Sequence, residues 1–135
     1  MRMIELTITE FAEKYYLHDS NIEKINFDEK TKNLTLTIEF CFWMQNWYKN
    51  DEPTNGKISV TFENVSFLEY DENISEKIFS NELDSEIYSA DIDEDGNFVI
   101  FSVETISDSD CDDIYWNLKI KSENVEVTEL ERYNL

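Results

Sequence analysis

The feature that most constrains the fold is a two-residue alternation of apolar and polar side chains that recurs along the chain. It is clearest in LTLTIEFCFW, residues 34–43. The apolar positions of this segment are Leu34, Leu36, Ile38, Phe40 and Phe42. Successive side chains of a strand point to opposite faces of a sheet, so this period predicts a half-buried β-strand.

Other segments with the same period are separated by short polar stretches. They are MIELTITE (3–10), NIEKINF (21–27), KISVTFENVSF (57–67), EIYSADI (86–92), FVIFSVE (98–104), IYWNLKIK (114–121) and NVEVTEL (124–130). Short turns between neighbouring strands favour antiparallel pairing. Two segments could instead be short helices: residues 10–16, with Thr9 as a possible N-cap, and residues 71–81, where Ile74 and Ile78 are four apart. Residues 44–56, which contain Asn55-Gly56, are expected to form a loop.

The fold class that follows is α+β and β-rich. We expect a mainly antiparallel curved sheet or sandwich of six to eight strands, with one or two short helices. At 135 residues the chain is expected to form a single domain, 1–135. No apolar stretch reaches the length of a membrane span, and the first ten residues lack the apolar centre of a signal peptide. A cytoplasmic location is therefore expected.

Acidic residues are concentrated in one part of the chain. The formal net charge is −20, and residues 61–113 hold seventeen acidic side chains against one basic residue, Lys77. Nucleic acids and anionic lipids are disfavoured as partners, because phosphates are bound by lysine and arginine. A concentrated negative field favours encounter with a basic protein. The alternative is that the acidity serves solubility.

The only histidine lies in His18-Asp19-Ser20. Along an extended chain His18 and Ser20 would share a face while Asp19 points away, so a catalytic triad is not assembled locally. We expect these residues to satisfy backbone groups at the start of a strand or helix, or to contribute to an interaction site. No catalytic residue is assigned, and the protein is expected not to be an enzyme.

The sequence DIDEDGN, residues 91–97, matches the first half of a calcium-binding loop through Asp91, Asp93 and Asp95. The twelfth position of that pattern, where glutamate belongs, is Ser102. A tight hairpin explains the same residues, and a weak divalent-cation site is the alternative. The chain has one histidine, two cysteines and two glycines, which disfavours zinc, P-loop and dinucleotide sites. No cofactor is expected.

An aromatic cluster lies where the strongest strand meets the following loop. Its members include Trp43, Trp47 and Tyr48, which could close the core, anchor a protein partner or stack on a sugar. Trp43 is on the threonine-bearing face of its strand. It is therefore the best candidate of the three for a role outside the core.

Four segments, LHDSNIEKI, LTLTIEF, ISVTFENVSF and LKIKSENVEV, resemble a pattern of small bacterial β-rich proteins that are otherwise uncharacterised. Some of these proteins are grouped with immunity proteins of polymorphic toxin systems. The distinctive element of the resemblance is Leu17-His18-Asp19-Ser20. The resemblance implies a cytoplasmic, non-enzymatic protein that binds and blocks a toxin, and it supplies no catalytic residues.

Together these observations predict an acidic protein-binding module for a basic partner, such as a toxin domain. The residues expected to contact that partner are Asp91, Asp93, Asp95, Asp108, Asp110, Asp112, Asp113, Trp43, Trp47, Tyr48, His18 and Asp19.

Overall fold

The structure is a computed structural model that describes residues 3–80, 83–106 and 113–134. Its strands are β1 (Met3–Leu6), β2 (Asn21–Asp28), β3 (Asn33–Cys41), β4 (Asn55–Glu63), β5 (Phe67–Tyr70), β6 (Ser85–Ile92), β7 (Val99–Ile106), β8 (Asp113–Lys121) and β9 (Asn124–Tyr133). One α-helix, α1 (Ile8–Lys14), and two 3₁₀ turns, η1 (Phe42–Met44) and η2 (Glu72–Ile74), complete the described elements.

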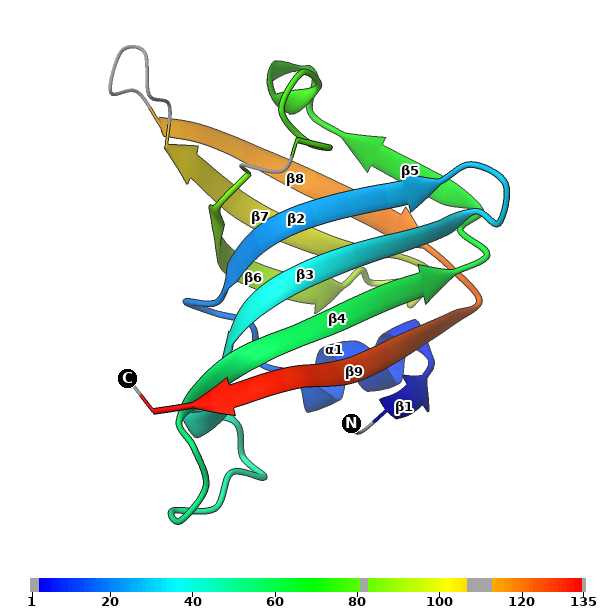
Figure 1. Ribbon diagram of the computed structural model, residues 1–135. Helices are drawn as coiled ribbons and strands as arrows, with labels where there is room; N and C mark the ends of the chain where they lie inside the picture. Colours follow the sequence, from blue (N-terminus) through cyan, green and yellow to red (C-terminus); the bar gives the residue numbers. More distant parts are fainter. Residues whose placement is uncertain (1–2, 81–82, 107–112, 135) are drawn as a thin grey trace.

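All nine strands belong to one antiparallel sheet in the order β1-β9-β4-β3-β2-β6-β7-β8-β5. The sheet folds back on itself, and we call its two halves the first wing (β1, β9, β4, β3, β2) and the second wing (β6, β7, β8, β5) (Figure 1). The wings meet at a seam where β2 pairs with β6 through only two residue pairs, Asn21 with Glu86 and Ile22 with Ser85.

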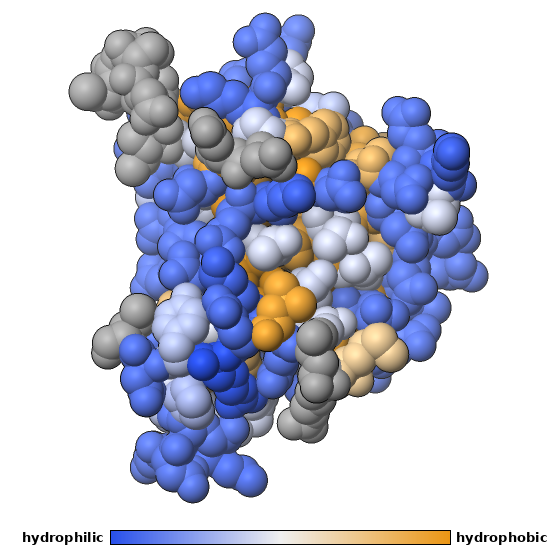
Figure 2. Space-filling view, in the orientation of Figure 1, coloured by the Kyte–Doolittle hydropathy of each residue, from blue (hydrophilic) through white to orange (hydrophobic). Residues whose placement is uncertain are grey.

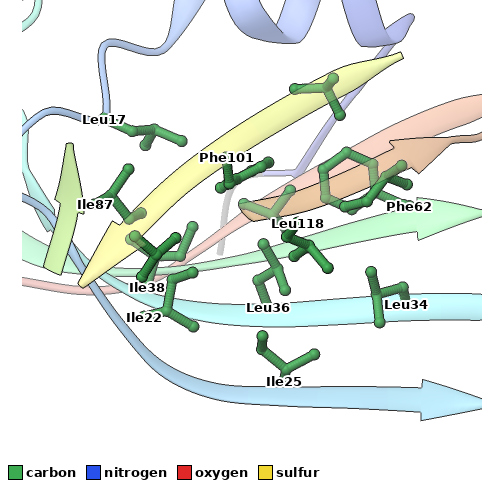
Figure 3. Close-up of a cluster of buried hydrophobic side chains, with 14 of the residues drawn as sticks. Leu17, Ile22, Ile25, Leu34, Leu36, Ile38, Phe62, Ile87, Phe101 and Leu118 are labelled. Atoms are coloured by element: carbon green, nitrogen blue, oxygen red, sulfur yellow. The ribbon is translucent and has the colours of Figure 1, made fainter. Parts of the chain in front are cut away.

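The core lies between the wings, on the inner face of the curved sheet. Apolar side chains from both wings point toward one another there (Figure 3), among them Ile22, Ile25, Leu34, Leu36, Ile38, Phe62, Ile87, Phe101 and Leu118. The alternating positions of β3 are fully buried, as their period predicts. Removing each such side chain from water contributes roughly 1.5–3 kcal/mol, so this row is a substantial part of the stability of the first wing.

Helix α1 covers one side of this core and contacts β1, β6, β7 and β9. Its N-cap is Thr7, not the expected Thr9. The Thr7 hydroxyl accepts from the Glu10 backbone N–H (3.1 Å), and the Glu10 carboxylate accepts from the Thr7 N–H (2.9 Å). Because this capping box starts the helix early, Ile8 is a buried helical residue and not the end of a strand.

The strand number is nine, where six to eight were expected. The extra strand is β5, which begins at Phe67, the last residue of KISVTFENVSF, and continues to Tyr70. Asn64 adopts a left-handed conformation (φ 50°), and the chain then crosses to the opposite edge of the sheet, where β5 pairs with β8. A period-two pattern continues through such a crossing, so the alternation alone could not reveal it.

The outer faces of the wings carry the polar half of each alternation. The side of the molecule seen in Figure 2 is mostly hydrophilic, with limited apolar areas. The one α-helix of the described residues has only seven residues, and no described helix has the length and apolarity needed to cross a membrane.

Candidate functional site

The acidic residues of segment 61–113 gather on the second wing and its connections. Twelve of the seventeen are described there: Glu69, Asp71, Glu72, Glu76, Asp84, Glu86, Asp91, Asp93, Glu94, Asp95, Glu104 and Asp113. Glu63 ends β4 on the first wing, and the remaining four, Glu82, Asp108, Asp110 and Asp112, lie outside the described residues. Acidity concentrated in sequence is therefore also concentrated on one half of the sheet.

The protein's own lysine and arginine residues do not neutralise this half. Between described residues, they form ion pairs that join Lys57 to Glu23 and Glu131, and Arg132 to Glu52 and Glu129. These pairs belong to the first wing and its neighbouring loop. No acidic side chain of residues 61–106 takes part in them, so the negative field of the second wing is left to solvent or a partner.

Two lysines on the second wing, both from β8, lie over aromatic rings. The Lys119 ammonium is 4.4 Å from the centre of the Phe98 ring, and that of Lys121 is 5.9 Å from the same centre. These cation–π contacts lie toward the β6–β7 hairpin end of the wing, where β7 begins.

Asp91, Asp93 and Asp95 lie at that hairpin end, and the contacts described next are those of Asp93. Asp93 Oδ1 accepts from the backbone N–H groups of Asn97 and Phe98, both at 2.9 Å. It thereby closes the hairpin turn, as the alternative to a cation site predicted. Within residues 3–80, 83–106 and 113–134, no group of three or more metal-binding side chains is assembled.

Asp113, the described member of the last acidic group of the expected site, is at the other end of the wing. Asp113 opens β8 and pairs with Ile106, whereas Asp108, Asp110 and Asp112 lie outside the described residues. Since β7 has eight residues, roughly 27 Å separates Asp113 from the hairpin. The acidic surface is therefore elongated along the strands.

The segment around His18 forms a turn that joins helix α1 to strand β2. The Ser20 N–H donates to the Leu17 carbonyl (3.0 Å), and Asp19 has a left-handed backbone (φ 67°) that aspartate tolerates. Two further backbone bonds attach the turn to β6: Asp19 N–H to the Ile87 carbonyl (3.1 Å) and Ile87 N–H to the Ser20 carbonyl (2.8 Å). The turn thus extends the short seam between the wings.

The side chains of this turn differ from the extended arrangement expected from sequence. His18 donates from Nδ1 to the Tyr88 carbonyl (2.9 Å), and its Nε2 is 3.4 Å from Asp19 Oδ1. Ser20 is fully buried, and its hydroxyl accepts from the Cys41 N–H (3.4 Å). The left-handed Asp19 causes this difference, because it turns its carboxylate back toward His18. A buried serine that is bonded to backbone has a structural role here.

Next to this turn, two tyrosines stand on the outer face of the second wing. Tyr88 from β6 and Tyr115 from β8 are 40% and 62% exposed, with ring centres 6.3 Å apart and planes at 20°. Glu104 of β7 lies between them and accepts a hydrogen bond from the Tyr88 hydroxyl (2.7 Å) and another from Tyr115. The hydroxyls of Tyr115 and Tyr88 lower the pKa of Glu104, which keeps this carboxylate ionised.

Two more carboxyl groups adjoin this tyrosine pair. Glu86 is directly opposite Glu104 in the β6–β7 ladder and hydrogen-bonds to Asp19. Burial raises the pKa of Glu86, and the bond and the negative charge of Asp19 raise it further. We refer to Tyr88, Tyr115, Glu104, Glu86 and Asp19 as the tyrosine–carboxylate surface.

The three aromatic residues expected at a partner site are divided between two places. Trp43 is 53% exposed and lines an open groove with Tyr48 and Cys41, in agreement with a position outside the core. Trp47 is half-buried and donates from Nε1 to the Lys14 carbonyl (3.1 Å). Trp47 therefore covers the end of the hydrophobic core that lies beside helix α1.

A pocket of about 340 Å³ lies on the other side of Trp47, between helix α1 and β9. Arg132 dominates its polar wall, but its guanidinium already donates to Glu52 (2.7 Å) and Glu129 (2.8 Å). The Lys14 ammonium is held over the Trp47 ring at 5.8 Å from its centre. Lys49 also lines the pocket, so two of its three cationic side chains, Arg132 and Lys14, are held by partners within the protein.

Sequence reasoning missed Tyr88, Tyr115, Glu86 and Glu104. The signal was present in the alternation, because a tyrosine at an outward position of a strand is exposed. Tyr115 lies between Ile114 and Trp116, and Tyr88 follows the inward Ile87. The stacking of the two rings depends on β6 and β8 flanking β7, and this could be read only after the sheet order was known.

Comparison with known proteins gives no match to a family model, a curated protein or a solved structure.

Proposed function

We propose that this protein is a non-enzymatic binding module whose second wing captures a basic protein domain, as an immunity protein masks a basic toxin. The observation that carries the proposal is the group of carboxylates on the second wing, which described lysine and arginine residues leave unneutralised across residues 61–106. A surface of one sign accelerates encounter with the opposite sign and rejects partners of like charge.

The mechanism is steering followed by occlusion. The elongated acidic wing orients the approaching basic domain, and contact then covers the functional surface of that domain. The wing suits this role because its strands are packed on a continuous core, which fixes the backbone from which the outer carboxylates project. A backbone that is already ordered loses little entropy when a partner binds.

Capture experiments with two charge-matched variants test the proposal. In the second-wing variant, Glu72→Gln, Asp91→Asn and Glu94→Gln remove three exposed charges. In the first-half variant, Glu13→Gln, Glu29→Gln and Asp51→Asn remove three exposed charges from residues 1–60. The two variants carry the same net charge, so a difference between them reports location and not total acidity.

Immobilised wild-type protein is exposed to lysate of the native host, and retained proteins are identified by mass spectrometry. We expect one basic protein to be retained at low salt and released at high salt, because exposed charges are screened within about 10 Å at 0.1 M. The retained protein is then purified, and its affinity for each variant is measured. It should bind the second-wing variant about tenfold more weakly than the first-half variant, which corresponds to about 1.4 kcal/mol of binding free energy. Equal affinity for the two variants, or retention of no basic protein, would mean that the acidity serves solubility.

A further inference from the structure

We infer that the tyrosine–carboxylate surface is the docking point for an arginine side chain of the basic partner. This inference rests on the proposed function and names the contact that the acidic wing would make. It is carried by an exposed pair of rings, by the charge beside them, and by an internal contact that shows how this protein holds a guanidinium.

The rings of Tyr88 and Tyr115 are exposed although each could have been a polar residue at no cost to the core. They come from β6 and β8, and their nearly parallel planes flank the side chain of Glu104 on β7. Partly exposed tyrosine supplies a large contact area with little side-chain entropy to lose, which is why it is common where proteins bind each other.

The charge beside the rings is net negative, and the basic side chain described in contact with it is His18, whose Nε2 is 3.4 Å from Asp19 Oδ1. Glu104 is kept ionised by the two tyrosine hydroxyls, and Glu86 shares a hydrogen bond with Asp19. A cation seated here would favour the ionised form of Glu86, whose hydrogen bond to Asp19 requires a proton on one of the two carboxyl groups. The nearest lysine on β8 is Lys119, four residues from Tyr115, or about 13 Å along the strand, and it lies over Phe98 instead.

The first wing contains an intramolecular contact of the same composition. The Arg132 guanidinium carbon is 4.0 Å from the centre of the Phe42 ring, and its nitrogens donate to Glu129 and Glu52. One guanidinium is therefore held by one aromatic face and two carboxylates. The tyrosine–carboxylate surface presents the same three components, an aromatic face with Glu104 and Glu86, without an arginine from the described chain.

Arginine fits these components better than lysine. A planar guanidinium stacks on a ring while its N–H groups donate to a neighbouring carboxylate, whereas an ammonium is a compact and strongly hydrated charge. The negative field of the wing attracts a partner through arginine or lysine side chains alike. A preference for arginine is therefore specific to this surface and separates the inference from the proposed function.

Two peptides of equal length and charge test the inference, one alternating arginine with glycine and the other alternating lysine with glycine. Affinities are measured by calorimetry at low salt, and the ring signals of Tyr88 and Tyr115 are followed by NMR. We expect the arginine peptide to bind about fivefold more tightly and to shift both ring signals. The variant Tyr88→Leu/Tyr115→Leu should lose this preference, whereas Tyr88→Phe/Tyr115→Phe should keep most of it, because the rings remain.

Phe67→Leu is the matched control, because it removes a partly exposed ring of the second wing that pairs with Lys121, six residues from Tyr115 along β8, and it should leave both affinities unchanged. Circular dichroism confirms that each variant is folded. Equal binding of the two peptides, or an arginine preference that survives the double leucine variant, overturns the inference. If binding is nevertheless weaker for the second-wing variant than for the first-half variant, the proposed function stands alone. Salt-sensitive binding of neither peptide would overturn both.

Discussion

A buried chain of hydroxyl groups under the tyrosine–carboxylate surface gives the sharpest test of how the second wing is held together. Trp116 Nε1 donates to the Thr105 hydroxyl (2.9 Å), Thr105 bonds to the Ser85 hydroxyl, and Ser85 donates to the Leu83 carbonyl (3.1 Å). All three side chains are at least 95% buried. They join β6, β7 and β8, the strands that carry the tyrosine–carboxylate surface.

Thr105→Val keeps the shape of this side chain and removes its hydroxyl. The Trp116 N–H then has no acceptor, which costs about 1–3 kcal/mol for a buried donor, and Ser85 loses a neutral hydrogen bond worth about 1 kcal/mol. The gain from burying a methyl group in place of the hydroxyl offsets part of this loss. We therefore expect Thr105→Val to lower the free energy of unfolding by about 2–3 kcal/mol, a large share of the stability of a domain this size.

Urea unfolding followed by tryptophan fluorescence and circular dichroism measures this loss, with the m-value required to stay unchanged. Thr105→Ser retains the hydroxyl and should cost only about 1 kcal/mol for the missing methyl group. In a Trp116→Phe background, where no donor is left unsatisfied, the cost of Thr105→Val should fall to about 1 kcal/mol. A loss of equal size in both backgrounds would refute the reasoning.

Three further predictions concern other parts of the fold. Thr7→Ala should cost about 1 kcal/mol in thermal or urea unfolding whereas Thr9→Ala should cost almost nothing, because only Thr7 caps helix α1. Gly56→Ala should cost about 3 kcal/mol in urea unfolding, because its new Cβ would lie 2.2 Å from a backbone oxygen of β9. Burial and three nearby glutamates raise the pKa of Glu63, whose Oε1 is buried without a described hydrogen-bond partner, so its ionisation opposes folding. The folded state therefore binds this proton more tightly than the unfolded state, and stability is lost as pH rises above about 4.5. Glu63→Gln should raise the free energy of unfolding by about 1 kcal/mol at pH 7 and by almost nothing at pH 4, and an equal gain at both pH values would contradict this assignment.

The alternation predicted the strands well because it directly records which side chains are buried. The hairpin of β2 and β3 and that of β6 and β7 lie where the pattern placed them. Asn55-Gly56 was expected in a loop, since this pair is typical of turns. Instead Gly56 is buried within β4, because β9 and the Phe42 ring approach too closely for any side chain. That requirement comes from distant segments and leaves no local signal.

The candidate site was predictable in its charge and not in its geometry. The segment 61–113 showed its acidity directly, and twelve of its seventeen acidic residues are described on the second wing and its connections. The sequence could not show that His18 and Asp19 lie beside Tyr88, because this contact depends on a turn attached to β6 by two backbone hydrogen bonds. It also could not show that Asp93 is occupied by its own hairpin.

The narrow seam between the wings has a mechanical consequence. Asp19 and Glu86 face each other across the junction, and the strands there share only two residue pairs. An arginine bound to both carboxyl groups would clamp the halves of the domain, so part of its binding free energy would resist their separation. Amide hydrogen exchange at Ile87 should then slow when the partner binds, while exchange at the far edge strand β1 stays as fast as in the free protein.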